Sequence, residues 1–277
     1  MACDSQVDQA DAYGNFEAIE VMVSAESRGR ILSFESLEGA ALKNGSVVAV
    51  IDTVQLHLKK VQLQSGETSL GARISTLDAQ VRANQVQLSN LEREKKRIDN
   101  LVEGGAATSK QQDDMEGQIE LLKAQITALE SQKASVYAER RTLDVQIRQV
   151  EDQIFRSMVR NPRDGIMLSK YKEEGEIAAP GQALYKLANM DELILRAYIS
   201  GNQLSEVETG KSVRIRFDVP GGMEETSGVV SWVSPSAEFT PKIIQTKEER
   251  VNLVYAIKVA VPNNGKLKIG MPGEVLF

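Results

Sequence analysis

Side chains that commonly carry catalysis are scarce and scattered in this chain of 277 residues. His57 is the single histidine, so neither a zinc cluster nor a nucleophile–histidine pair can draw on a second one. Two pairs of adjacent carboxylates, Asp113–Asp114 and Glu173–Glu174, fall where a helix start and a turn are expected, and solvated charge is the ordinary reading there. We therefore predict that the chain is not an enzyme and uses no cofactor or metal.

One tripeptide matches part of a phosphate-binding loop. Gly210-Lys211-Ser212 has the end of that motif, but the motif needs another glycine five residues before Gly210, where this chain has Ser205. The following residues, KSVRIRF, alternate like a strand, whereas the motif leads into a helix. We interpret the tripeptide as a turn that enters a strand.

Composition narrows the class of protein further. The net charge is −6, which argues against a nucleic-acid partner, because such proteins usually carry a basic surface. Aromatic residues make up only 5% of the chain, which argues against one large globular core and favours long helices. The longest clean apolar run is VVAVI at 47–51, far short of the roughly 18 residues of a membrane span.

Cys3 is the single cysteine, so an internal disulfide is excluded. It follows a small residue and precedes the polar stretch DSQVDQADAYG. This pattern resembles the junction at which bacterial lipoproteins begin their mature, lipid-modified chain. The resemblance implies lipid attachment at Cys3 and an anchoring linker over residues 1–15. An incidental exposed thiol is the alternative.

Residues 53–159 repeat apolar side chains at alternating spacings of three and four and contain no proline. Two such seams, each sustained over about six heptads, predict a coiled coil. The first seam comprises Leu56, Leu63, Leu70, Ile74, Leu77, Val81, Leu88, Leu91, Ile98 and Val102, interrupted by Lys60, Glu67, Asn84 and Lys95. The second comprises Met115, Ile119, Leu122, Ile126, Leu129, Val136, Leu143, Ile147, Val150 and Ile154, interrupted by Lys133 and Arg140.

The two helices must turn back on each other within a few residues. Gly104-Gly105 is expected to end the first helix, since paired glycines are costly inside a helix and common just after one. Thr108 or Ser109 is expected to cap the second. So short a connection forces an antiparallel hairpin.

The hairpin interrupts a repeated pattern of glycines, G-x9-G-x5-G. Both copies alternate apolar and polar residues as short strands, and such strands need a partner sheet to bury their apolar faces. Because the hairpin returns the chain to its start, residues 16–52 and 160–192 are expected to pair as one β-sandwich. We expect positive φ or tight packing at Gly175 and Gly181. The repeated glycines are Gly29, Gly39 and Gly45, then Gly165, Gly175 and Gly181.

From residue 193 to 277 the chain alternates apolar and polar residues in runs separated by glycine and proline turns, with a short helix expected near 203–207. This pattern predicts a small all-β barrel. The expected fold class is therefore α+β and elongated. It combines a lipoyl-like β-sandwich, split by a long antiparallel coiled-coil hairpin, with a C-terminal β-barrel.

The tandem glycine-marked halves resemble the biotinyl/lipoyl carrier fold, but the short hairpin that carries its prosthetic lysine is replaced by the coiled coil. The order half, coiled coil, half, barrel resembles the periplasmic adaptor proteins (membrane fusion proteins, HlyD family). The stretch NPRDGIMLSKYKEEGEIAAPGQALYKLANMDELILRAYIS carries this resemblance most strongly. Residues 237–259, AEFTPKIIQTKEERVNLVYAIKV, resemble the barrel segment of adaptors that serve ABC-type exporters.

The resemblance implies an adaptor subunit of a tripartite efflux or secretion system. It would link an inner-membrane transporter, expected to be of the ABC type, to an outer-membrane TolC-type duct. It also implies a homo-oligomer, expected to be a hexameric ring. The expected location is the periplasm of a Gram-negative bacterium, with anchoring to the inner membrane through the N-terminal lipid. The alternatives are a lipoyl/biotinyl carrier-type subunit and a coiled-coil scaffold protein.

Adaptors of the drug-efflux type dock the hairpin tip onto the duct with an Arg-x3-Leu-x6-Ser pattern. Arg97 and Leu101 keep the first spacing, Thr108 stands where the serine is expected, and Ser109 follows it. The resemblance thus implies duct docking by these four residues. Alternatively, Leu101 belongs to the seam, Arg97 is a solvated charge and Ser109 is the N-cap.

Overall fold

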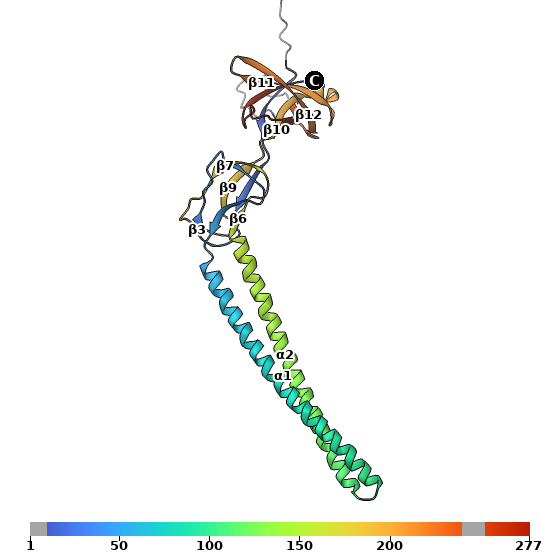
Figure 1. Cartoon of the computed structure of the whole chain (residues 1–277). Helices are drawn as coiled ribbons and strands as arrows, with labels where there is room; N and C mark the ends of the chain where they lie inside the picture. Colours follow the sequence, from blue (N-terminus) through green and yellow to red (C-terminus); the bar gives the residue numbers. More distant parts are fainter. Residues whose placement is uncertain (1–9, 240–252) are drawn as a thin grey trace, which may run out of the picture. The chain divides into compact units, whose positions relative to one another are not determined.

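The computed structural model describes residues 10–239 and 253–277, so Cys3 and most of the segment 237–259 that resembles ABC-exporter adaptors lie outside the described residues. The chain divides into two units (Figure 1). Residues 52–158 form a helical unit, and the chain on both sides of it forms a β unit.

The helical unit is a hairpin of two long helices, α1 (Val54–Glu103) and α2 (Ser109–Arg156), which lie side by side (Figure 1). At a rise of ~1.5 Å per residue, α1 extends about 75 Å. Every apolar residue predicted on the seam is buried or half-buried, which confirms the heptad assignment. In the described ranges, no helix is long and apolar enough to cross a bilayer. The buried members are Leu63, Ile74, Leu77, Val81, Ile119, Leu122, Ile126, Val136, Ile147 and Val150.

Charged residues that interrupt the seam pair across the hairpin. Because each pair joins one particular position of α1 to one of α2, the pairs help to fix the antiparallel register. A hydrogen bond from Lys133 to Asp78 raises the pKa of that ammonium above its usual value. The pairs are Lys60–Glu151 (2.8 Å), Glu67–Arg140 (2.9 Å), Asp78–Lys133 (2.5 Å) and Lys95–Glu116 (3.0 Å).

Two four-stranded sheets share one core and form a β-sandwich. Their orders are β2-β9-β7-β4 and β6-β5-β3-β8, so each sheet takes two strands from each side of the hairpin. The core includes Ile31, Ile51, Met167, Leu184 and Leu187, all fully buried. The strands are β2 (Glu20–Ser24), β3 (Gly29–Ser33), β4 (Ala41–Leu42), β5 (Val47–Ile51), β6 (Met158–Arg160), β7 (Gly165–Lys170), β8 (Ile177–Ala178) and β9 (Ala183–Ala188).

The two halves exchange backbone hydrogen bonds in symmetric pairs. Each bond donated by the first half has a counterpart donated by the second, at one constant offset along the sequence. The sandwich therefore has internal two-fold symmetry, and neither half forms a sheet of its own without strands from the other. The bonds are Gly39 N–H to Met167 O (2.8 Å), Gly175 N–H to Ile31 O (2.9 Å), Gly45 N–H to Asn161 O (2.8 Å) and Gly181 N–H to Ala25 O (2.8 Å).

The glycines that donate these bonds adopt the left-handed backbone conformation. Gly175 has φ 87° and Gly181 has φ 81°, which confirms the expectation for both. Their counterparts Gly39 and Gly45 have φ 85° and 75°. A side chain at any of these turns would be strained, because only glycine adopts this region freely.

One buried polar cluster breaks the symmetry. The Tyr185 hydroxyl donates to Asn161 Oδ1 at 3.0 Å, while Asn161 Nδ2 donates to the carbonyls of Lys43 (3.2 Å) and Arg163 (2.5 Å). Burial raises the pKa of Tyr185 to about 12, because the phenolate would have to exist away from water. The amide of Asn161 is thus satisfied inside the sandwich core.

The remaining strands form a seven-stranded sheet, β10-β1-β15-β11-β12-β14-β13, which pairing of β10 with β14 closes into a barrel. The short helix expected near 203–207 is a 3₁₀ helix at Gly201–Glu206. The barrel strands are β1 (Ala12–Glu17), β10 (Glu192–Ser200), β11 (Ser212–Val219), β12 (Gly222–Val233), β13 (Glu238–Phe239), β14 (Leu253–Pro262) and β15 (Pro272–Leu276).

Strand β1 corrects the predicted domain boundaries. The predicted linker over residues 1–15 includes the start of β1, which lies between β10 and β15, so the barrel takes a strand from outside 193–277. Only Ala12 and Phe16 of β1 are buried, so the sequence of this strand shows no clear alternation of apolar and polar residues from which it could be predicted. Gly14 permits the close packing, since a Cβ there would come within 1.9 Å of the Arg196 carbonyl oxygen.

Candidate docking site at the hairpin tip

Helix α1 ends in a Schellman turn built on the predicted glycine pair. Gly105 has φ 74° and donates its N–H to Val102 O at 3.0 Å. Ala106 N–H reaches back to Leu101 O at 2.8 Å. These two hydrogen bonds pair carbonyl groups that would otherwise lack a partner at the end of the helix, so they fix the backbone conformation of the tip.

Helix α2 begins with a capping box. Gln111 N–H donates to Thr108 Oγ1 at 3.4 Å, and Thr108 N–H donates to Gln111 Oε1 at 2.9 Å. The structure thus selects Thr108, and not Ser109, as the N-cap. The spacing T-x-x-Q is the sequence signal for this arrangement.

Leu101 and Val102 are neighbours with different environments. Val102 is half-buried on the seam, as the heptad count predicts, while Leu101 is 44% exposed. One turn earlier, the side chain of Arg97 is 70% exposed and pairs with Glu94 at 2.5 Å. The reading of Leu101 as a seam residue is therefore wrong, and an apolar side chain stands beside a guanidinium on the surface of α1.

A polar network below the tip joins the two helices. Lys95 Nζ lies 3.0 Å from Glu116 and 3.1 Å from Asp99, and Gln112 Nε2 donates to Asp99 Oδ1 at 2.9 Å. Hydrogen bonds to Glu116 and then to Asp99 raise the pKa of Lys95. From the sequence only Lys95 is predicted, as a seam interruption, because Glu116 and Gln112 on the opposite arm show no spacing signal that joins them to it.

The four predicted docking residues flank one turn. Arg97 and Leu101 lie in the last two turns of α1, and Thr108 and Ser109 stand at the start of α2. The arrangement offers an apolar contact, a charged donor and hydroxyls on a rigid backbone, which suits binding to another helix end. The predicted lipid site, Cys3, lies outside the described residues.

No family model matches the chain. A UPF0194 membrane protein of Acidithiobacillus ferridurans is 25% identical over 95% of this chain and 85% of its own length. A UPF0194 membrane protein of Citrobacter koseri is 23% identical over 96% and 87%.

Solved structures show the same architecture. MacA of Actinobacillus actinomycetemcomitans matches 95% of this chain and 76% of its own, with a TM-score of 0.60 at 18% identity. The membrane fusion protein Spr0693 of Streptococcus pneumoniae R6 matches 95% and 96%, with a TM-score of 0.57 at 13% identity. The periplasmic adaptor protein EmrA matches 96% and 97%, with a TM-score of 0.51 at 16% identity. The chain has the fold of the HlyD-type membrane fusion proteins, or periplasmic adaptors.

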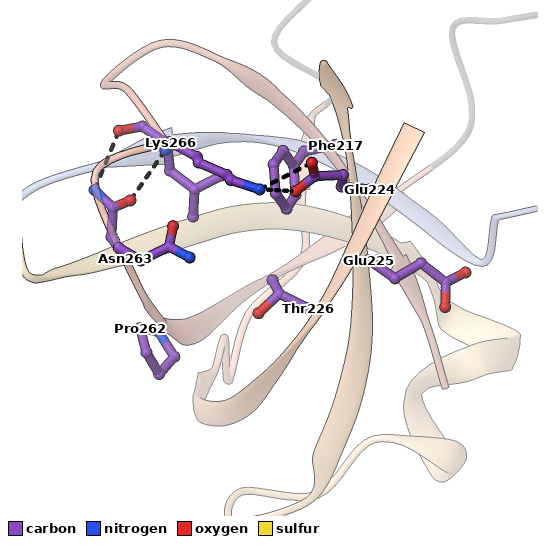
Figure 2. Close-up of a pocket in the computed structure, with 9 residues that line it drawn as sticks. Phe217, Glu224, Glu225, Thr226, Pro262, Asn263 and Lys266 are labelled. Atoms are coloured by element: carbon purple, nitrogen blue, oxygen red, sulfur yellow. Dashed lines mark hydrogen bonds and ion pairs between the residues drawn. The ribbon is translucent and has the colours of Figure 1, made fainter. Parts of the chain in front are cut away.

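The barrel of this adaptor fold has an open pocket of about 310 Å³ between β11, β12 and the loop after β14. Figure 2 shows Lys266 extended to Glu224, at 2.7 Å, along its wall. Asn263 Oδ1 accepts hydrogen bonds from the N–H groups of Gly265 and Leu267, which stabilises the loop that contains all three residues. Within residues 10–239 and 253–277, no cluster of three metal-ligating side chains was found. The polar groups named here stabilise the pocket wall.

Proposed function

We propose that this chain is the adaptor subunit of a tripartite efflux or secretion system, linking an inner-membrane transporter of the ABC type to an outer-membrane TolC-type duct. One observation carries the proposal: a rigid tip, on a hairpin about 75 Å long, that displays Leu101 and Arg97 outside the seam. The adaptor fold supports it, as does the resemblance of residues 237–259 to adaptors of ABC exporters.

In this proposal the tip binds the helical ends of the duct. Leu101 is the apolar anchor, which loses its exposed surface on contact, and Arg97 adds a charge-assisted hydrogen bond. Thr108 acts mainly through the cap, since its hydroxyl accepts from Gln111 N–H. Ser109, exposed in the first turn of α2, offers a hydroxyl to the partner.

The rest of the assembly follows from the same proposal. Copies of the chain associate into a ring, which we expect to be hexameric, in the periplasm of a Gram-negative bacterium. A lipid on Cys3 anchors each copy to the inner membrane. The subunit performs no reaction. The lipoyl-like sandwich is structural, because α1 and α2 occupy the connection between its halves in place of a lysine hairpin.

The test is a paired substitution at the tip, Leu101→Asp with Arg97→Asp, in the full-length protein. Export should fall at least about tenfold, because a buried aspartate at the contact opposes binding. Helix content and co-purification with the transporter should stay unchanged. Tyr137→Asp is the matched control, since Tyr137 is 45% exposed on the helical unit but distant from the turn in sequence. Normal export by the double variant, or its unfolding, would contradict the docking assignment.

A further inference from the structure

The outer surface of the β-barrel has two sides that differ in composition. Alternate residues of each strand face outward from the barrel. On β11 and the strands beside it these outward residues are charged and paired, with Arg216 3.3 Å from Glu274 and Arg214 3.8 Å from Glu225. A polar outward face of this kind is typical of an antiparallel sheet in contact with water.

The other side, over β1, β10, β14 and the end of β12, is rich in aromatic residues. Strand pairing places Tyr13 opposite Tyr198, and it places Lys258 between Arg196 and Trp232. The side chains of Tyr13, Val229 and Trp232 are 57%, 47% and 37% exposed, so large apolar groups meet solvent here. We call this surface the aromatic face, and its residues are Tyr13, Arg196, Tyr198, Val229, Trp232 and Lys258.

Two cations of the aromatic face lie over its rings. Lys258 Nζ is 5.2 Å from the centroid of the Trp232 ring, and the guanidinium carbon of Arg196 is 5.9 Å from that of Tyr198. Arg196 also pairs with Glu238 at 3.1 Å. Lys258 has no carboxylate partner among residues 10–239 and 253–277. Its ammonium group is therefore available to an anionic group of a partner.

This combination of side chains is the one that proteins place at the surface of a lipid bilayer. Tyrosine and tryptophan join an apolar ring to a polar group and are enriched at the level of the lipid headgroups, where long cations reach the phosphates. Ten residues separate Tyr13 from Cys3, and ten extended residues span at most ~36 Å. A lipid on Cys3 would therefore hold Tyr13 within about that distance of the membrane.

We propose that the aromatic face binds the headgroup region of a phospholipid bilayer. The rings of Tyr13 and Trp232 enter that region, and the ammonium group of Lys258 contacts lipid phosphate. The inference rests on the proposed function, which supplies the bilayer, and it adds a contact that orients the barrel on the membrane. A second copy of the chain is a poorer partner, because two aromatic faces turned toward each other would bring the cations of both copies together.

Trp232 is the single tryptophan, so the fluorescence of the protein reports on the aromatic face itself. The full chain with Cys3→Ser, which carries no lipid, is mixed with vesicles of phosphatidylcholine and phosphatidylglycerol in equal parts. The emission should move to shorter wavelength, and brominated lipids should quench it. Absence of both changes would overturn the proposal. A shift that follows protein concentration without vesicles would assign the face to a second copy and would overturn it as well.

Substitutions on the face give an independent measure by vesicle flotation. Lys258→Gln should weaken binding about fivefold, because one cation near the lipid phosphates is lost. Tyr13→Ser should weaken it at least about fivefold through the lost ring, and the exposure of Tyr13 should leave the fold intact. Lys266→Gln is the matched control, since it removes the same charge from the wall of the barrel pocket, where Lys266 pairs with Glu224. Equal weakening by Lys258→Gln and Lys266→Gln would contradict the proposal.

This contact and the docking of the tip can fail independently. The tip pair Leu101→Asp and Arg97→Asp should leave vesicle binding unchanged, because neither residue belongs to the aromatic face. Absence of vesicle binding by the parent protein would therefore overturn this inference alone. Normal export by the tip variant would contradict the proposed docking alone.

Discussion

The β-sandwich and the helical hairpin are held together in different ways. In the sandwich, two halves exchange backbone hydrogen bonds at glycines with positive φ around a fully buried core. In the hairpin, a narrow seam and a few cross-arm ion pairs join helices whose remaining surface is exposed. Backbone geometry therefore limits substitution in the sandwich, while the hairpin leaves most positions free. Those free positions are where partner contacts can be built.

The same substitution should have opposite effects in the two regions. A Cβ at Gly165 would lie 2.5 Å from the Ala188 carbonyl oxygen, whereas a Cβ at Gly71 of α1 meets nothing within 4 Å. We expect Gly165→Ala to destabilise the β unit by about 2–4 kcal/mol. Gly71→Ala should stabilise the hairpin by roughly 0.5–1 kcal/mol. Calorimetry that separates the two unfolding transitions measures both, and shifts of the same sign would refute the contrast.

Alkaline pH should destabilise the β-sandwich, because the buried hydroxyl of Tyr185 ionises. The folded protein holds the neutral phenol, with its pKa raised to about 12 by burial, while an unfolded tyrosine titrates near 10. The stabilisation is therefore complete below pH 10 and is lost as the pH rises from 10 to about 12. Tyrosinate absorbance should show one of the six tyrosines ionising last, and that step should be absent in Tyr185→Phe. Ionisation of all tyrosines together near pH 10 in the folded protein would contradict this assignment.

The smallest effect should come from the cross-arm ion pairs. Arg140 and Glu67 lie 2.9 Å apart with side chains 47% and 30% exposed. A double-mutant cycle with Arg140→Gln and Glu67→Gln should give a coupling of about 0.2–1 kcal/mol, decreasing with added salt. A coupling several times larger would show that these pairs, and not the apolar seam, hold the hairpin.

Much of this contrast can be predicted from the sequence. The heptad pattern places Val136 and Ile74 on the seam, because the same spacing recurs many times along each helix. The glycine repeat predicts positive φ at Gly175 and Gly181, because the same spacing of glycines occurs in both halves. Strand β1 was missed, because its role depends on partners far away in sequence. The Asn161–Tyr185 cluster was missed for the same reason.

The candidate site was predicted in part. Spacing alone distinguishes exposed Leu101 from seam residue Val102, since adjacent helical residues point in different directions. The choice of Thr108 over Ser109 as the cap needed the geometry of Gln111, although the T-x-x-Q spacing signals it. The Asp99–Gln112 contact joins two arms through a turn, so no pattern along either helix indicates it.

Site-specific photocrosslinking in intact cells tests the proposed docking of the hairpin tip. A photoreactive residue replaces Leu101 in the full-length protein, and Gln85, exposed along α1, carries the control probe. If the tip docks as proposed, the probe at 101 will capture an outer-membrane channel protein and the probe at 85 will not. Capture of no outer-membrane protein at 101, or equal capture at both positions, would contradict it.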